Sequence, residues 1–325
     1  RHDLSALVPE GVRACRRPMA ARPLREAWRR FEHPGLEWWT GPVDVVHGTN
    51  FVVPPTRRAA AVVTVHDLTS LHFPELCDDA TLVYPKLLRR AMARGAMVHA
   101  VSRFVADEMV TDLGADPDRV VVIHSGVPPV PAADPAVGRT LAGAERYVLA
   151  LGTVEPRKDL PLLVRAFDTV AAARPGVRLV IAGPDGWGGQ ALGRALARSD
   201  HPGQMVRLGW VDADQRAGLL RGASVLAYPS RYEGFGFPPL EAMTVGVPVV
   251  ASDAGALPEV LGDSAVLVPV GDCDALAQAL ARVLDDPEHQ ATLVEAGHRR
   301  VRRYDWARTA EHMVDLYRRA AGERA

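Results

Sequence analysis

The sequence is poor in cysteine. Among 325 residues there are three, Cys15, Cys77 and Cys273, and they are widely separated along the chain. This spacing matches neither a disulfide framework nor the paired cysteines of a zinc site, and it suits a reducing compartment. The first residues also lack the cationic and apolar regions of a secretory signal peptide. We therefore expect a cytoplasmic protein without a thiolate-bound metal.

The chain also lacks a strong net charge and long apolar runs. Lys and Arg number 38 against 39 Asp and Glu, so no nucleic-acid partner is expected. No run of eighteen apolar residues that could form a transmembrane helix is present. Residues 13–30 hold seven arginines, which we interpret as a solvated helix face. Peripheral contact of this segment with anionic lipid at the inner face of the membrane stays open as the alternative.

Short apolar runs rich in β-branched residues alternate with longer segments of helical periodicity. This alternation is typical of βαβ units whose parallel strands are buried on both faces of a sheet. The predicted strands cover residues 43–47, 60–66, 97–102 and 120–124 in the first half, and residues 147–152, 178–183, 205–208, 224–228, 247–252 and 265–268 in the second half. The sequence therefore predicts an α/β protein with two doubly wound parallel sheets.

The two predicted sheets divide the chain into two domains. Residues 126–143 contain four prolines among alanines, a composition that breaks regular structure and indicates an interdomain linker. We place an N-terminal domain at residues 1–129 and a C-terminal domain at residues 130–303. Residues 304–325 have apolar side chains at helical spacing and should pack one face of a helix on a domain.

The most informative segment is Arg231-Tyr-Glu-Gly-Phe-Gly-Phe-Pro-Pro-Leu-Glu241, which follows a predicted strand and opens a helix. Gly234 and Gly236 allow the backbone to approach a ligand closely. The helix that begins at the two prolines directs the positive end of its dipole toward the same place, which favours a phosphate. Because prolines lack an N–H, the amides available to an anion reduce to neighbours such as those of Phe237 and Leu240.

Two carboxylates flank this helix start. Glu233 precedes the helix and Glu241 lies about one turn inside it, so both can face one pocket and accept hydrogen bonds from paired hydroxyl groups. Their Glu-x7-Glu spacing resembles the signature of glycosyltransferase family 4, whose GT-B fold has two Rossmann-like domains facing a cleft. The resemblance implies that Glu233 holds hydroxyls of the donor sugar and acts in catalysis, and that Glu241 binds the nucleotide ribose. The other donor-binding residues implied in this segment are Gly234, Phe235, Gly236, Phe237 and Leu240.

A second segment, Leu151-Gly-Thr-Val-Glu-Pro-Arg-Lys158, is also similar to a family motif and carries two cations after a predicted strand. A guanidinium fork and an ammonium suit a diphosphate whose charge grows as the glycosidic bond breaks, so Arg157 and Lys158 are predicted to bind it. Adjacent residues point in different directions, which favours Lys158 over Arg157. Many family members carry an arginine where this chain has Thr153.

Two further loops end neighbouring strands of the C-terminal domain. In the family the corresponding loops surround the nucleotide base, which implies donor contacts at Gly183 and Val211. We interpret Trp187 and Trp210, in the same loops, as packing residues rather than as base-stacking residues.

In the N-terminal domain, Val63-Thr-Val-His-Asp67 ends a predicted strand with a histidine. The segment resembles the family's active-site histidine motif at the edge of the cleft, so His66 is predicted to be catalytic. The segments at His47 and Ser102 are weaker echoes of acceptor-side motifs. His47, Ser102 and Asp67, which follows His66, are predicted to line the acceptor site.

The two ends of the chain also compare with the family. Tyr304-Asp-Trp306 is similar to the motif that leads the family's final helix back across the N-terminal domain, so residues 304–325 are expected there. Family members begin with a strand, a glycine-rich loop and a helix, whereas residues 2–8 match the second strand. The first strand and the glycine-rich loop are therefore expected to be missing.

The resemblance implies transfer of a hexose from a nucleotide diphosphate sugar with retention of anomeric configuration. No metal or other cofactor is expected, since cations and a helix dipole stabilise the leaving diphosphate. The motif variants resemble those of mannosyltransferases that build polysaccharides, so GDP-mannose is the favoured donor and a glycan or lipid-linked saccharide the acceptor. Two alternatives stay open: a nucleotide-sugar epimerase or glycan phosphorylase of the same fold, and an inactive relic that binds nucleotide sugar.

Overall fold

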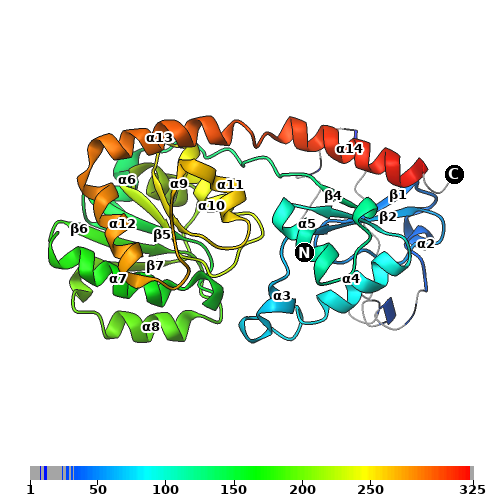
Figure 1. Ribbon diagram of the computed structural model, residues 1–325, viewed down its shortest axis with the longest axis horizontal. Coiled ribbons are helices and arrows are strands. Elements are labelled where there is room, and N and C mark those ends of the chain that lie inside the picture. Colours follow the sequence, from blue (N-terminus) through cyan, green and yellow to red (C-terminus); the bar gives the residue numbers. More distant parts are fainter. Residues whose placement is uncertain are drawn as a thin grey trace.

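The structure is a computed structural model that describes residues 33–322 together with Val8, Gly11, Val12, Leu24, Ala27, Trp28 and Phe31. The strand predicted at residues 2–8 lies, up to residue 7, outside the described residues. Two parallel sheets lie one after the other along the long axis of the molecule (Figure 1). The expected α/β class with two parallel sheets is confirmed.

The N-terminal sheet has the strand order β1-β2-β3-β4 and all its strand pairs are parallel. Its strands are β1 (Val45–Gly48), β2 (Ala60–Val65), β3 (Met97–Ala100) and β4 (Val120–Val122). Its helices are α2 (Glu37–Thr40), α3 (Thr69–His72), α4 (Tyr84–Ala93) and α5 (Arg103–Thr111). Every residue of β2 and β3 is buried, as expected of central strands covered on both faces.

The C-terminal sheet has the strand order β10-β9-β8-β5-β6-β7, again with all pairs parallel. Its strands are β5 (Arg146–Leu151), β6 (Val177–Ala182), β7 (Met205–Gly209), β8 (Val225–Tyr228), β9 (Val249–Ser252) and β10 (Val266–Val268). This is the Rossmann order, and it reverses between β5 and β8. Ligands of open α/β sheets bind outside the carboxyl ends of the strands at such a reversal.

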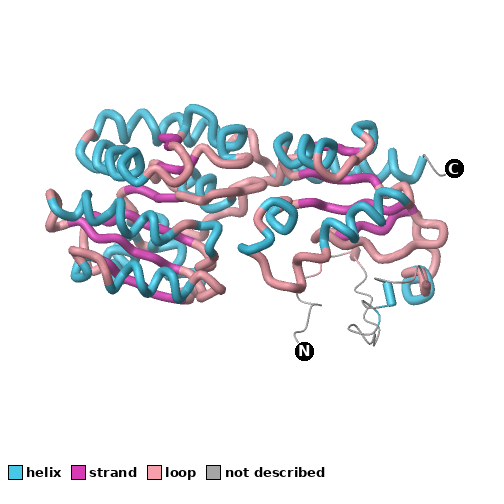
Figure 2. The backbone as a smooth tube through the Cα atoms, turned by 60° about the horizontal axis from the view of Figure 1, so that its bottom comes forward, coloured by secondary structure: helices cyan, strands magenta, loops and turns pink. Residues whose placement is uncertain are grey.

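Helices enclose both sheets, as Figure 2 shows for the two halves of the molecule. In the C-terminal half they are α7 (Leu160–Ala172), α8 (Gly189–Ala197), α9 (Ala213–Gly222), α10 (Phe237–Thr244), α11 (Leu257–Leu261), α12 (Cys273–Asp285) and α13 (Pro287–Val301). None of the helices within the described ranges is both long enough and apolar enough to cross a membrane.

The linker predicted at residues 126–143 is wrong in its second part, because α6 (Pro135–Ala142) is a helix. The side chain of Asp134 caps this helix by accepting a hydrogen bond from the Ala136 amide, and Pro135 occupies the first helical position, where its missing N–H costs nothing. Gly143 ends the helix with a φ of 64°. The proline and alanine content of the segment indicated a linker, although the order Asp134, Pro135 and Gly143 is typical of the start and end of a helix.

The last helix, α14 (Trp306–Gly322), follows α13 in sequence but lies on the N-terminal sheet (Figure 1). Its Leu316 and Ala320 are buried in one cluster with Ala60 and Val62 of β2. The chain therefore passes between the two halves twice, and α14 fastens the end of the C-terminal half to the first sheet.

A chain of side-chain hydrogen bonds crosses the N-terminal sheet from α14 to the end of β4. Tyr317 Oη lies 2.7 Å from His47 Nδ1, and His47 Nε2 lies 2.7 Å from Thr64 Oγ1. Thr64 Oγ1 lies 2.9 Å from His99 Nδ1, and His99 Nε2 lies 2.8 Å from the Ile123 carbonyl oxygen. Burial lowers the pKa of both His47 and His99, so both imidazoles are neutral at neutral pH. Because the Ile123 carbonyl can only accept, His99 Nε2 donates to it and His99 Nδ1 accepts from the Thr64 hydroxyl. Thr64 in turn accepts from His47 Nε2, and His47 Nδ1 accepts from the Tyr317 hydroxyl.

Protonation of these histidines should destabilise the protein. Burial, with the neighbouring His99, lowers the pKa of His47 from 6.5 to about 4. Because the pKa of His47 is lower in the folded than in the unfolded state, the neutral ring contributes its full stabilisation of the fold above pH 6.5. This contribution is lost as the pH falls toward 4. We expect the free energy of unfolding in urea to fall by about 2 kcal/mol across this window. The fall should be smaller in His47→Gln and unchanged in His312→Gln, an exposed histidine of α14; equal pH dependence in all three proteins would contradict this account.

Candidate active site

The predicted donor residues meet at the carboxyl ends of β5 and β8, where the strand order reverses. The short helix η4 (Pro156–Lys158) follows β5, and the loop of residues 229–236 joins β8 to α10. The two segments are held together by a hydrogen bond of 2.7 Å from the Arg231 amide to the Arg157 carbonyl oxygen. An ion pair of 2.9 Å between Arg231 Nε and Asp159 Oδ2 adds a second tie.

Glu233 lies between two cations. Its Oε1 is 2.5 Å from Lys158 Nζ, and its Oε2 is 2.7 Å from Arg157 Nη1. The expectation that adjacent cations point apart is wrong here, because the tight turn of η4 lets both side chains converge on one carboxylate. Lys158 also lies over the ring of Tyr228, 4.4 Å from its centroid. Arg157 also forms an ion pair with Glu155, with 3.1 Å between Arg157 Nε and Glu155 Oε2.

This cluster is buried and strongly polarised, since the side chain of Glu233 is 8% exposed and that of Lys158 12%. Burial alone would raise the pKa of Glu233, but Lys158 and Arg157 outweigh it and hold that pKa at about 2. Burial lowers the pKa of Lys158, and Glu233 offsets part of that effect. The pKa of Arg157 is raised, because Glu233 outweighs the effect of burial. Glu233 is therefore an anion, and Arg157 a cation, at neutral pH.

The glycines of the β8–α10 loop approach protein rather than leaving room for a ligand. A Cβ at position 234 would lie 1.7 Å from the carbonyl oxygen of His66, which belongs to the N-terminal half. Gly236 has a φ of 110°, which favours glycine, and a Cβ there would lie 2.8 Å from a side-chain atom of Leu257. The close approach predicted at these glycines is present, but its partners are the other domain and α11.

The start of α10 limits which of its predicted groups can reach a ligand. Phe237 is the first helical residue, so the amide of Leu240 is already directed at the Gly236 carbonyl inside the helix. The Leu240 side chain is fully buried. The ring of Phe235 lies 5.5 Å from that of Tyr304 and is also buried. Because Pro238 and Pro239 lack an N–H, the free donors at this helix end are the amides of Gly236 and Phe237. The predicted contact through Leu240 is not supported by the helix geometry.

Glu241 is buried one turn into α10, and its carboxylate pairs with the guanidinium of Arg216 from α9. Sequence reasoning did not single out Arg216. The available signal was the capping box of Asp212 and Gln215, which marks the start of α9 and places Arg216 on its first turn.

The loops expected around the nucleotide base lie at the same sheet edge. Gly183 has a φ of 145°, and a Cβ there would lie 2.0 Å from the Gly152 carbonyl oxygen, so this glycine permits close packing of two loops. Val211 is half-buried against the core. Trp210 and Trp187 are 71% and 52% exposed, so the interpretation of both as packing residues is wrong. Trp187 donates instead to the Leu76 carbonyl oxygen of the N-terminal half, at 2.8 Å.

The predicted residues of the N-terminal half have different surroundings. His66 lies at the end of β2, next to Gly234, and its Nε2 is 2.9 Å from the Thr49 carbonyl oxygen. Asp67 accepts a hydrogen bond from the Thr69 amide at 3.0 Å. Ser102 is fully buried and caps α5, so its predicted acceptor contact is wrong. Both ring nitrogens of His47 are used by Tyr317 and Thr64, which does not favour an acceptor contact for it.

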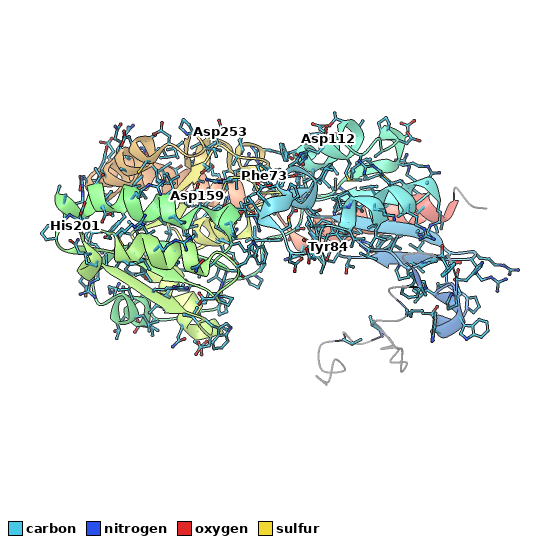
Figure 3. The ribbon with its side chains drawn as sticks, turned by 90° about the horizontal axis from the view of Figure 1, so that it is seen from below. Phe73, Tyr84, Asp112, Asp159, His201 and Asp253 are labelled. Atoms are coloured by element: carbon cyan, nitrogen blue, oxygen red, sulfur yellow. The ribbon has the colours of Figure 1, made fainter. Side chains whose placement is uncertain are left out.

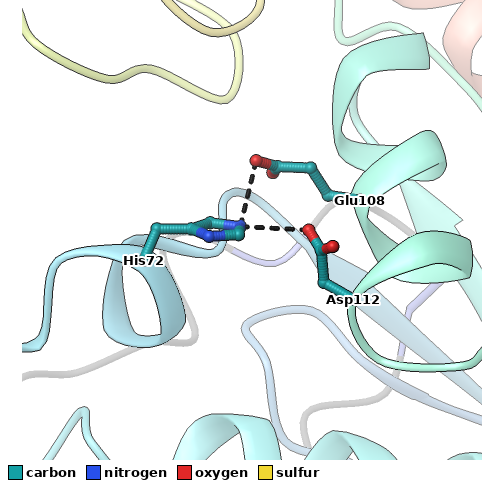
Figure 4. Close-up of side chains that lie close together, drawn as sticks. All are labelled: His72, Glu108 and Asp112. Carbon is teal, nitrogen blue, oxygen red and sulfur yellow. Dashed lines mark ion pairs between the residues drawn. The ribbon is translucent and has the colours of Figure 1, made fainter.

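A histidine and two carboxylates from α3 and the end of α5 gather in the N-terminal half (Figure 4). His72 Nε2 is 3.1 Å from Glu108 Oε1 and 3.3 Å from Asp112 Oδ2. The ligand atoms of these three residues lie within 4.8 Å of one another. The group includes none of the predicted donor-binding residues, and Glu108 also accepts a hydrogen bond from the Tyr232 hydroxyl.

Two parallel-sheet domains whose facing edges carry a cation pair and a helix start define the GT-B class of glycosyltransferases. The family described as Glycosyl transferases group 1 matches residues 138–300, and Glycosyltransferase Family 4 matches residues 4–130. The first match covers half of the 325 residues. The chain therefore belongs to the group 1 glycosyl transferases, which confirms both the expected GT-B fold and the expected enzyme class.

Relatives refine this assignment. The chain is 29% identical to the O-antigen chain mannosyltransferase B of Escherichia coli over 304 residues, 91% of this chain and 77% of that protein. It is 29% identical to the phosphatidyl-myo-inositol mannosyltransferase of Mycolicibacterium smegmatis over 343 residues, 99% of this chain and 86% of the relative. A crystal structure of Anabaena HepE in complex with UDP and glucose matches with a TM-score of 0.67 at 19% identity, over 91% of this chain and 79% of that one.

Removal of the Glu233 charge should destabilise the unliganded protein. Glu233→Gln leaves two buried cations without their shared counterion, so we expect the free energy of unfolding to fall by about 3 kcal/mol at neutral pH. Glu295→Gln is the matched control, because that carboxylate forms an exposed pair with Arg299 one helical turn away; it should cost less than about 0.5 kcal/mol. Chemical denaturation of both variants measures the difference, and equal losses would contradict the role assigned to Glu233.

Proposed function

We propose that this glycosyltransferase transfers a hexose, with mannose favoured, from a nucleotide diphosphate sugar to a glycan or lipid-linked saccharide with retention of anomeric configuration. The observation that carries the proposal is the convergence of Arg157 and Lys158 on one buried carboxylate at the strand reversal. In the free protein, Glu233 occupies the position in which the cations would receive an anionic ligand. A diphosphate is the anion that two adjacent cations and the first amide of α10 fit.

Donor binding would then exchange one set of ion pairs for another. A diphosphate that takes the cations releases Glu233, whose carboxylate becomes free to accept hydrogen bonds from donor-sugar hydroxyls. As the bond between sugar and phosphate breaks, negative charge grows on the diphosphate, and Arg157 and Lys158 stabilise that charge. The departing group needs no metal ion in this scheme. Glu241, which pairs with Arg216, is proposed to bind the ribose.

The acceptor is proposed to enter from the N-terminal side, beside His66. Gly234 packs on the His66 carbonyl, so the donor loop and the end of β2 adjoin. His66 is the side chain that we propose for catalysis on this side, with Asp67 beside it. GDP-mannose stays the favoured donor because the relatives from Escherichia coli and Mycolicibacterium smegmatis are mannosyltransferases by name. UDP is the nucleotide bound by HepE.

Peripheral contact with anionic lipid is proposed for the N-terminal edge of the molecule. Trp38 and Phe31 are 79% and 64% exposed there. The ring of Trp28, from the arginine-rich segment, lies 6.2 Å from that of Trp39. Exposed aromatic rings that follow an arginine-rich segment in the sequence suit the headgroup layer of a membrane that holds a lipid-linked acceptor.

The chain has two lysines, Lys86 and Lys158, which makes lysine-selective acetylation a test of the donor site. Lys86 is exposed on α4 and serves as an internal reference. We expect GDP or GDP-mannose to slow the acetylation of Lys158, read by mass spectrometry, without changing that of Lys86. GDP should also raise the melting temperature of wild type and of Lys86→Ala but not of Lys158→Ala, since only native-state binding stabilises.

The same panel, extended to UDP, ADP and their sugars, identifies the donor. Release of the nucleoside diphosphate together with a glycosylated acceptor would support transfer over epimerisation or phosphorolysis. No protection of Lys158 by any nucleotide would contradict the proposed donor site.

A further inference from the structure

Tyr232, which directly precedes Glu233, reaches from the C-terminal half into the N-terminal half. Its side chain is buried, although it projects from a loop of the other domain. Its ring centroid lies 5.5 Å from that of Phe73, 5.8 Å from that of Phe104 and 5.9 Å from that of His72. Figure 3 labels Phe73, which lies where the two halves of the molecule meet. Tyr232 is thus an anchor between the domains.

The hydroxyl of Tyr232 makes two hydrogen bonds in this pocket. It accepts from the Leu68 amide at 2.9 Å and donates to Glu108 Oε2 at 2.5 Å. Leu68 lies two residues after His66, and Glu108 lies on α5. One hydroxyl therefore joins the end of β2, the helix α5 and the β8–α10 loop.

The backbone of the same residue belongs to the donor site. Arg157 Nη1 donates to the Tyr232 carbonyl oxygen at 3.2 Å and pairs with Glu233 at 2.7 Å. Tyr232 thus has its side chain fixed by one half of the molecule and its main chain fixed by the other. Movement of the ring out of its pocket would move Glu233, because the two residues are adjacent.

Space filling alone does not account for this arrangement. A phenylalanine would fill the aromatic pocket equally well, whereas the hydroxyl is bonded on both its donor and its acceptor side. The carboxylate that receives it is kept partly buried at a cost, since burial raises the pKa of Glu108 to about 7 and the Tyr232 hydrogen bond counters that effect. His72, Asp112 and Asp67 are the other titratable groups that face it.

A second contact with α5 supports an anchor between the halves. Glu259, on α11, accepts hydrogen bonds from the amides of Arg103 and Phe104 at 2.8 and 2.9 Å, at the start of α5. His124 Nε2 lies 2.8 Å from the same carboxylate. The C-terminal half therefore holds α5 at its beginning through Glu259 and one turn before its end through Tyr232.

We propose that Tyr232 is a positioning residue, whose hydroxyl, bonded to Glu108 and Leu68, fixes Glu233 beside the end of β2, where His66 lies. The inference rests on the proposed function, since it assigns a task to the residue beside the proposed donor-sugar ligand. Loss of the hydroxyl leaves the donor site and its cations in place but loosens the geometry in which the transition state is stabilised.

The test compares steady-state transfer by wild type, Tyr232→Phe, Glu108→Leu and the double variant. We expect each single variant to lower kcat about tenfold, which corresponds to the net free energy of about one hydrogen bond. KM for the donor should change less than about twofold. The double variant should be no slower than either single variant, because both remove the same bond. Glu108→Gln, which keeps an acceptor oxygen, should retain most of the activity.

Tyr147→Phe is the matched control, because it also removes a buried hydroxyl, bonded to the Leu219 carbonyl oxygen at 2.7 Å within the C-terminal half. It should lower the melting temperature and leave kcat unchanged. Wild-type kcat in Tyr232→Phe, additive losses in the double variant, or a loss confined to KM would each overturn the inference.

A measurement without turnover separates this inference from the proposed function. Tyr232→Phe should speed hydrogen exchange at the Leu68 amide, whose acceptor it removes, and Tyr147→Phe should not. If wild type transfers no sugar, the proposed function fails. Unchanged exchange at Leu68 in Tyr232→Phe would overturn the anchoring role whatever the activity.

Discussion

The ion pairs of Glu233 with Arg157 and Lys158 are the interaction on which the account of this protein depends. The two cations are balanced in charge by Glu233 and by Glu155, which pairs with Arg157. Removal of Glu233 leaves buried cations without their shared counterion, which is costly. In the proposed function, the same pairing holds the cations in the position where a diphosphate would bind. We expect such a site to be stable in the free protein and to exchange the Glu233 carboxylate for the diphosphate of a bound ligand.

The fold places these charges where two domains meet. The Rossmann order of the C-terminal sheet creates a gap between the connections that follow β5 and β8, and both donor segments come from that gap. Three residues of the C-terminal loops contact the N-terminal half: Gly234, Tyr232 and Trp187. Helix α14 returns to the first sheet and ties the two halves at a second place, so the donor loop and His66 are held against each other from two sides.

The ten strands predicted from periodicity between residues 43 and 268 are present, because parallel buried strands leave runs of β-branched residues that periodicity detects. The cations and both carboxylates of the donor motif were also predictable, since their residue types suit the ligand. What the sequence could not reveal depends on contacts between distant residues. Gly234 is a glycine because of the His66 carbonyl, Tyr232 is an anchor because of Glu108, and His47 lies in a hydrogen-bond chain that only the packing of α14 completes. Helix α6 was missed for a local reason, because proline content was weighed above the Asp134 cap.

The most direct measurement is a pair of crystal structures, without and with a bound nucleoside diphosphate. The account predicts that the 2.5 Å contact between Lys158 Nζ and Glu233 in the free protein is replaced by contacts of Lys158 and Arg157 with phosphate oxygens, while Glu233 turns toward the donor-sugar position. A diphosphate bound elsewhere, with both ion pairs of Glu233 intact, would contradict the central claim.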